Sequence, residues 1–280
     1  MLNNKLDINV NNNFNKLRLK LLFLPFLLLL IIAFILFIKS SFSVDGYIKI
    51  QENLFFYLNG KLSQLPSLQY NLTQLGDALI IFSLVTIFII YIPKIWGAVL
   101  TSGLISLIVS YVLKRVFAVP RPAAIFDNES FTIIGKTLKG ATSLPSGHSI
   151  TTFSVITILL FAFMPKKITS KITWSVFILL VGLVVVISRV GVGAHYPLDV
   201  LIGATIGYIC AVLAIFINNK FNIWAWIRNK KYYPIFIVIL ITGGLTIVHK
   251  ILKANLIIFY FSLFAIISTF YLMIKIYVKK

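Results

Sequence analysis

Charged residues and cysteine are both scarce in this sequence. Only 12% of its 280 residues are charged and 59% are hydrophobic, whereas a soluble domain is about 25% charged. A water-soluble protein of this length could not bury so much apolar surface. The single cysteine, Cys210, rules out an intrachain disulfide. These scarcities exclude a soluble enzyme, a disordered chain and a disulfide-stabilised secreted domain, and they predict an integral membrane protein.

Acidic residues are scarcer still, with 7 carboxylates against 26 Lys and Arg and a net charge of +19. In a soluble protein such an excess would suggest a nucleic-acid partner. No basic patch with interleaved stacking aromatics is present, so nucleic acid is not an expected partner. The charge is better explained by membrane topology and by contact with the anionic lipids of a bilayer.

The apolar runs predict an all-α fold, a polytopic membrane bundle of about eight transmembrane helices. A spanning helix needs about 20 mostly apolar residues. The qualifying runs are 21–38, 78–93, 95–113, 149–164, 173–188, 198–217, 234–249 and 255–274. The first run is longer than the apolar core of a signal peptide, so we expect a retained helix. An even number of spans places both termini on one side.

The distribution of basic residues predicts the orientation. Fifteen of the 26 Lys and Arg, and all four Trp, fall on the side of the termini. Cytoplasmic loops carry the excess of Lys and Arg, so we expect cytoplasmic termini in an inner or plasma membrane. The Asn-rich start predicts a disordered tail. Residues 47–58 fit an interfacial helix or a packed extramembrane loop equally well.

Three segments on the predicted outer side collect residues that apolar helices avoid: 114–122, 145–148 and 188–199. They hold two of the three histidines and three of the five arginines. Ionisable groups at the edge of an apolar bundle are costly and indicate function. In a chain that otherwise prefers lysine, the planar and permanently charged fork of arginine suits an oxyanion.

These side chains suit phosphoryl transfer. Lys114, Arg121 and Arg189 can neutralise phosphate oxygens, and Ser146 and Gly147 lie where a helix begins, with free N–H groups and the positive dipole end. Asp199 can accept a hydrogen bond from one ring nitrogen of His195 and leave the other as a nucleophile. His148 is then available as the general acid. The candidate catalytic residues are His195, His148 and Asp199, and the candidate phosphate ligands are Lys114, Arg121, Ser146, Gly147 and Arg189.

The three segments resemble the signature of the type 2 phosphatidic acid phosphatase (PAP2) superfamily, K-x6-R-P, P-S-G-H and S-R-x5-H-x3-D. The resemblance implies a six-helix core and a metal-independent phosphatase without a cofactor. It also implies that His195 forms a phosphohistidine, that Asp199 orients it, and that His148 protonates the leaving group and later activates water.

The resemblance also suggests a division of the chain. Residues 1–20 would form a cytoplasmic N-terminal tail and 21–217 a PAP2-like membrane phosphatase core. Residues 218–280 would add a C-terminal transmembrane hairpin, which is a departure from the six-helix pattern. This departure leaves the substrate class and the oligomeric state open.

The expected activity is hydrolysis of a membrane lipid phosphate on the outer or periplasmic face. Candidate substrates are undecaprenyl diphosphate, lipid A, phosphatidylglycerol phosphate and phosphatidic acid. A lipid phosphotransferase would use the same phosphohistidine. A transporter or flippase would need polar groups at mid-membrane, and these are missing. A zinc site of His148, His195 and Asp199 is disfavoured by the neighbouring cations Lys114, Arg121 and Arg189.

Overall fold

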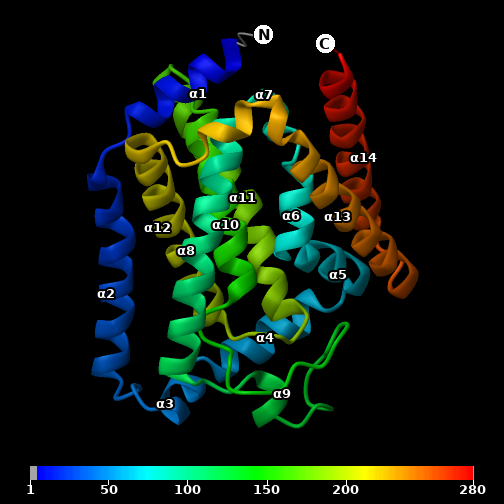
Figure 1. Cartoon of the computed structure of the whole chain (residues 1–280). Coiled ribbons are helices and arrows are strands. Elements are labelled where there is room, and N and C mark those ends of the chain that lie inside the picture. Colours follow the sequence, from blue (N-terminus) through cyan, green and yellow to red (C-terminus); the bar gives the residue numbers. More distant parts are fainter. Residues whose placement is uncertain (1–4, 280) are drawn as a thin grey trace.

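The computed structural model describes residues 5–279, and within them all regular secondary structure is helical. The elements are α1 (Lys5–Asn15), η1 (Leu19–Leu22), α2 (Phe23–Ile38), α3 (Val44–Lys49), α4 (Glu52–Leu62), α5 (Pro66–Gln74), α6 (Ala78–Leu84), α7 (Phe88–Tyr91), α8 (Pro93–Phe117), α9 (Pro122–Ile125), α10 (Gly147–Ala162), α11 (Ile168–Gly191), α12 (Pro197–Phe221), η2 (Ala225–Arg228), η3 (Lys230–Tyr232), α13 (Tyr233–Lys253) and α14 (Ile257–Val278). The predicted all-α membrane bundle is confirmed (Figure 1).

Six helical segments of the described residues are long and apolar enough to cross a membrane. They are Leu19–Ile38, Pro93–Ile125, Ile168–Gly191, Pro197–Phe221, Lys230–Lys253 and Ile257–Val278. Their outward faces are apolar: on α2 and α8, for example, Phe34 and Leu107 are exposed. Lipid tails solvate such faces, whereas water does not. The chain is therefore a multi-pass membrane protein.

Two of the eight predicted spans differ from the expectation. The segment 149–164 forms α10, which has only 16 residues. The segment 78–93 is broken into α6 and α7 rather than one continuous helix. At the break, the hydroxyl of Ser83 donates to the carbonyl of Leu79, and that of Thr86 to the carbonyl of Ser83 at 2.8 Å. Such side-chain bonds compete with the helical backbone bonds, and Val85 and Thr86 are β-branched.

The short helix α10 lies at the centre of the bundle and packs on α8, α11 and α12. Its contact with α12 is very close at the start of α10. A Cβ atom built on Gly203 of α12 would lie 2.7 Å from the carbonyl oxygen of Ser146, so only glycine fits there. This close approach brings the beginning of α12 beside the beginning of α10.

The N-terminal region is not the disordered tail that its asparagines predicted. Residues 5–15 form α1, which packs on α8, α10 and α12. Val10 and Phe14 are buried, and the amide of Asn13 donates to the carbonyls of Ala162 and Met164. These carbonyls follow the last turns of α10 and lack helical partners there. The asparagine thus serves tertiary packing, which composition does not reveal. Residues 1–4 lie outside the described part.

Different helices lie at the two ends of the bundle. Helix α1 and the last turns of α14 lie at one end, and α3, α4 and α9 lie at the other (Figure 1). Residues 47–58, left open between an interfacial helix and a loop, fall on α3 and α4. At the C-terminus, α13 and α14 pack on each other and α14 packs on α6. An ion pair of 3.0 Å between Lys250 and Asp77 also joins this hairpin to the residue before α6.

Candidate active site

The three sequence segments meet at the end of the bundle that carries α3, α4 and α9, and each lies where a helix begins or ends. Lys114 is in the last turn of α8, Arg121 precedes α9, Ser146, Gly147 and His148 open α10, Arg189 is in the last turn of α11, His195 lies between α11 and α12, and Asp199 is in the first turn of α12. Helix ends place these groups at one depth without interrupting an apolar span.

His195 and Asp199 form a buried pair, with exposed fractions of 1% and 0%. The His195 Nδ1 atom lies 3.5 Å from Asp199 Oδ2. Three other groups donate to the same carboxylate: the Ser143 hydroxyl at 2.6 Å, the Tyr47 hydroxyl at 2.8 Å and the Tyr196 N–H at 3.0 Å. They hold Asp199 in one orientation beside the Nδ1 side of the imidazole.

The other ring nitrogen of His195 faces a cation. Its Nε2 atom lies 3.3 Å from Nη1 of Arg121, which also donates to the carbonyl of Ala194. A guanidinium can only donate, so Nε2 presents its lone pair to Arg121 and Nδ1 carries the proton on the side of Asp199. This tautomer, assigned from the hydrogen bonds, points an unprotonated nitrogen toward the cations.

The protonation of His195 is controlled by its surroundings. Burial lowers the pKa of its imidazole well below the usual value, and the positive charges of Arg121, Arg189 and Lys114 lower the pKa further. His148 contributes in the same direction. The imidazole is therefore neutral near pH 7.

The start of α10 is open to an anion. The Ser146 side chain caps the helix by accepting from the Ser149 N–H at 3.4 Å, and its own N–H donates to the carbonyl of Asp199. A Cβ atom built on Gly147 would lie 3.5 Å from Lys114 Nζ. Glycine leaves that space free, so an oxyanion could reach both the ammonium and the first N–H groups of the helix.

Arg189 is a buried cation with an exposed fraction of 5%. Its Nη1 donates to the Thr73 hydroxyl at 2.5 Å, and its Nε atom is buried without a hydrogen-bond partner. Within residues 5–279 no carboxylate lies within ion-pair distance of it. A buried charge without a counter-ion is costly, and a bound anion would remove that cost.

His148 differs from His195 in that its ring makes no side-chain hydrogen bond to any residue that the structure describes. It packs against the backbone of Gly76, where an added Cβ would lie 2.6 Å from the His148 Cβ. The ring also lines a mostly apolar groove of about 520 Å³ between α6, α8 and α10. Its nitrogens are thus free to meet a ligand that enters from this groove.

The structure brings together all eight predicted site residues, but sequence reasoning missed several of their partners. Tyr47, Thr73 and Gly76 come from α3, α5 and the turn before α6, far upstream of the three segments. Asn59 of α4 joins the loop before α10 to the end of α11, because its amide donates to the carbonyls of Thr132, Val190 and Gly191. Only Ser143, two residues before Pro145, lay close enough to a motif to be suspected.

No group of three or more His, Cys, Asp or Glu side chains within residues 5–279 is arranged to hold a metal ion. The zinc alternative would have required His148, His195 and Asp199 around one point. Instead, the Asp199 carboxylate is occupied by the three donors from Ser143, Tyr47 and Tyr196.

Comparison with known proteins places this site in a family. A search of curated proteins gives no match. Among solved structures, the crystal structure of Aquifex aeolicus LpxE is 23% identical, with a TM-score of 0.49 over 60% of this chain and 95% of that chain. Residues 95–223 match the model of the PAP2 superfamily, and this range holds all eight site residues. The region that carries the site, residues 95–223, is therefore similar to the PAP2 superfamily, and the protein is a phosphatase.

Proposed function

We propose that the protein hydrolyses the phosphate ester or diphosphate of a membrane lipid through a phosphohistidine on His195. The observation that carries this proposal is the orientation of the imidazole. Its Nδ1 side is held by Asp199 and its Nε2 lone pair points at Arg121, 3.3 Å away. A neutral imidazole with a fixed tautomer and an unprotonated Nε2 beside cations is the arrangement that a nucleophile for phosphorus requires.

The reaction follows from these positions in two steps. Burial and the neighbouring cations lower the pKa of His148, so it takes up its proton when the anionic substrate binds and offsets those cations. In the first step, Nε2 of His195 attacks phosphorus, the bond to the leaving oxygen breaks, and His148 gives that proton to the leaving oxygen. In the second, His148 takes a proton from water, the resulting hydroxide attacks the phosphohistidine, and the P–N bond breaks. Inorganic phosphate leaves, and the electron pair returns to Nε2.

Charge stabilisation comes from the groups around the predicted phosphate position. Arg121, now bonded to Nε2, would exchange that contact for a phosphate oxygen as the substrate enters. Lys114, Arg189 and the N–H group of Gly147 would bind the remaining oxygens, whereas the N–H of Ser146 stays bonded to the carbonyl of Asp199. Such preorganised donors favour the transition state because they need no rearrangement when charge develops.

The lipid character of the substrate is supported by the groove beside His148. It runs along α8 from Leu100 to Ser110 and is lined mostly by apolar residues of α6, α8 and α10. Ten helical residues span about 15 Å, which is half the hydrocarbon thickness of a bilayer. A hydrocarbon chain in this groove would leave its phosphate beside His148 and Gly147. By the distribution of Lys and Arg, we place this end on the outer or periplasmic face.

We expect the purified protein in detergent to release phosphate from at least one of four lipids in the presence of EDTA. The lipids are undecaprenyl diphosphate, lipid A, phosphatidylglycerol phosphate and phosphatidic acid. Because the chain would bind in the groove, kcat/KM should exceed that for water-soluble glycerol phosphate by about 10²-fold or more. Equal rates would contradict the lipid assignment. Transfer of phosphate to an added acceptor lipid without release would identify a phosphotransferase instead.

The lowered pKa of His195 predicts an unusual acid limb in the pH profile. His195 must be neutral to attack, and burial and neighbouring cations keep it neutral to well below its usual pKa of about 6.5. We therefore expect kcat/KM to stay at its plateau as pH falls through 6.5, after correction for ionisation of the substrate phosphate. A half-maximal value at pH 6.5 or above would show that His195 is not so perturbed.

A further inference from the structure

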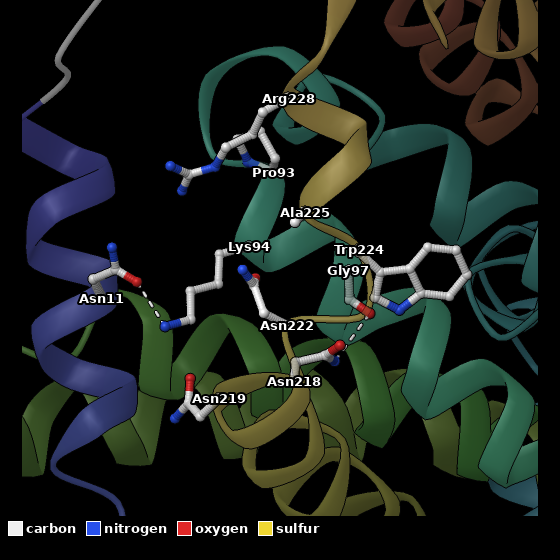
Figure 2. A pocket seen from close by; sticks show the side chains of 10 residues that line it. All are labelled: Asn11, Pro93, Lys94, Gly97, Asn218, Asn219, Asn222, Trp224, Ala225 and Arg228. Atoms are coloured by element: carbon white, nitrogen blue, oxygen red, sulfur yellow. Dashed lines mark hydrogen bonds between the residues drawn. The ribbon is translucent and has the colours of Figure 1, made fainter.

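We propose that the protein holds a second, non-catalytic binding pocket for a phosphate group at the end of the bundle opposite the active site. The pocket has a volume of about 340 Å³ and lies between α1, the start of α8, the end of α12 and η2 (Figure 2). These elements lie at the end where α1 and α7 are found, whereas the catalytic groups lie at the other end (Figure 1). It is therefore separate from the site described above.

Lys94 is the central group of this pocket. It is half-buried in the first turn of α8, and its ammonium donates to the side-chain oxygen of Asn11 at 2.6 Å (Figure 2). Within residues 5–279 no carboxylate lies within ion-pair distance of Lys94. The nearby Asp7 pairs with Arg228 instead, at 2.9 Å. An ammonium has three donors, so two remain for an anion.

The side-chain amides of Asn218 and Asn219, near Lys94, differ in how many of their hydrogen-bonding atoms already have a partner in the protein. Asn218 is saturated, since its amide donates to Gly97, Thr101 and Ala214. Asn219 donates to the carbonyl of Phe14, but its side-chain oxygen is buried and has no partner. A buried acceptor left without a donor costs free energy, so this oxygen indicates a ligand that also carries a hydroxyl.

The polar groups of the pocket fit a phosphate that carries a hydroxyl better than an anion that can only accept hydrogen bonds. Lys94 and Arg228 line the pocket, and Arg228 is paired with the carboxylate of Asp7, so Lys94 leaves the pocket with a positive charge. The start of α8 and the end of α12 meet here, so their helix dipoles offset each other and the side chains carry the attraction. Hydrogen phosphate, or a phosphate ester with a nearby hydroxyl, offers oxygens to Lys94 and a donor to Asn219. Free phosphate and a lipid headgroup share this chemistry.

The first arm of the test measures inorganic phosphate binding to the detergent-solubilised full chain by calorimetry. Lys94→Gln should remove one phosphate site, or weaken it by about tenfold or more, as expected for a lost charge-assisted bond. Hydrolysis of lipid phosphate should stay within twofold. Lys275→Gln, which removes a charge from α14 at the same end, is the matched control and should change neither.

The second arm distinguishes the source of the phosphate. The His195→Ala protein is mixed with phosphatidylglycerol or phosphatidylcholine, and retained lipid is counted by native mass spectrometry. Selective retention of phosphatidylglycerol that depends on Lys94, without a free phosphate site, would assign a lipid headgroup. A Lys94-dependent site for inorganic phosphate would assign the soluble ion.

Either result supports the pocket, and binding that is absent or equal in all variants would overturn it. If Lys94→Gln fails to fold, Asn222→Gly is measured instead, because Asn222 lines the same pocket and loss of its amide should also weaken phosphate binding. It removes a pocket amide at a position with φ of +47°, which glycine adopts readily.

Discussion

Replacing His195 with glutamine is expected to lower phosphate release by at least about 10⁴-fold, because the phosphoryl group then has no nucleophile on the enzyme. Glutamine is close to histidine in size and can still accept from Arg121. Loss of activity would therefore reflect loss of the attacking nitrogen rather than collapse of the site. The measurement is the initial rate of phosphate release from the best lipid found, together with labelling of the protein by ³²P-substrate.

The matched control is His249→Gln on α13, an exposed histidine outside the site. It should leave both the rate and the label unchanged. A His195→Gln protein that still becomes labelled, or that keeps more than about one hundredth of the rate, would assign the nucleophile to another residue. Thermal unfolding of both variants in detergent checks that each is folded.

The second large effect is expected for His148→Asn, with a loss of about 10²–10⁴-fold, the usual range for one general acid or base. His148 acts as the general acid in the first step of the proposed reaction and as the general base in the second. Substrates with different leaving groups distinguish these two roles. An alkyl phosphate needs a proton on its leaving oxygen, and an aryl phosphate needs it much less. With an aryl phosphate, we expect the variant to release the phenol in a fast burst and then turn over slowly.

This burst distinguishes His148 from a residue that merely supports the fold. A structural defect would lower the burst and the steady rate together, and it would affect both substrates equally. A variant within twofold of the native protein on alkyl phosphates would remove His148 from the mechanism. Asparagine is smaller than histidine, so the substitution does not crowd the backbone of Gly76, against which the His148 side chain packs.

That the candidate site residues lie together at one end of the bundle was predictable, because their chemistry conflicts with their surroundings. Histidine, arginine and aspartate at the edge of apolar runs are costly, and three such segments on one predicted side indicated a shared site. Apolar length likewise predicted the long helices. Both features, the polar residues at the edges of apolar runs and the length of those runs, can be seen locally in the sequence. They predict the fold well because burying a polar group in the membrane costs so much free energy.

What could not be predicted depends on contacts between distant segments. The hydroxyl of Tyr47 reaches Asp199 across 152 residues, and nothing near Tyr47 marks it. Asn13 lies in a polar stretch that predicts a tail, yet its amide donates to the carbonyls of Ala162 and Met164 at and just after the end of α10. The break between α6 and α7 also escaped prediction, because hydropathy does not report that Ser83 and Thr86 divert backbone carbonyls.

The ion pair between Lys250 and Asp77 has a consequence for how the C-terminal hairpin relates to the active site. One oxygen of Asp77 accepts from the N–H of Leu79 and so caps α6, and the other holds Lys250 of α13. The residue before Asp77 is Gly76, on which the His148 ring rests. A shift of the hairpin would thus be transmitted to the imidazole through two consecutive residues. We therefore expect the position of the hairpin to affect the packing around His148.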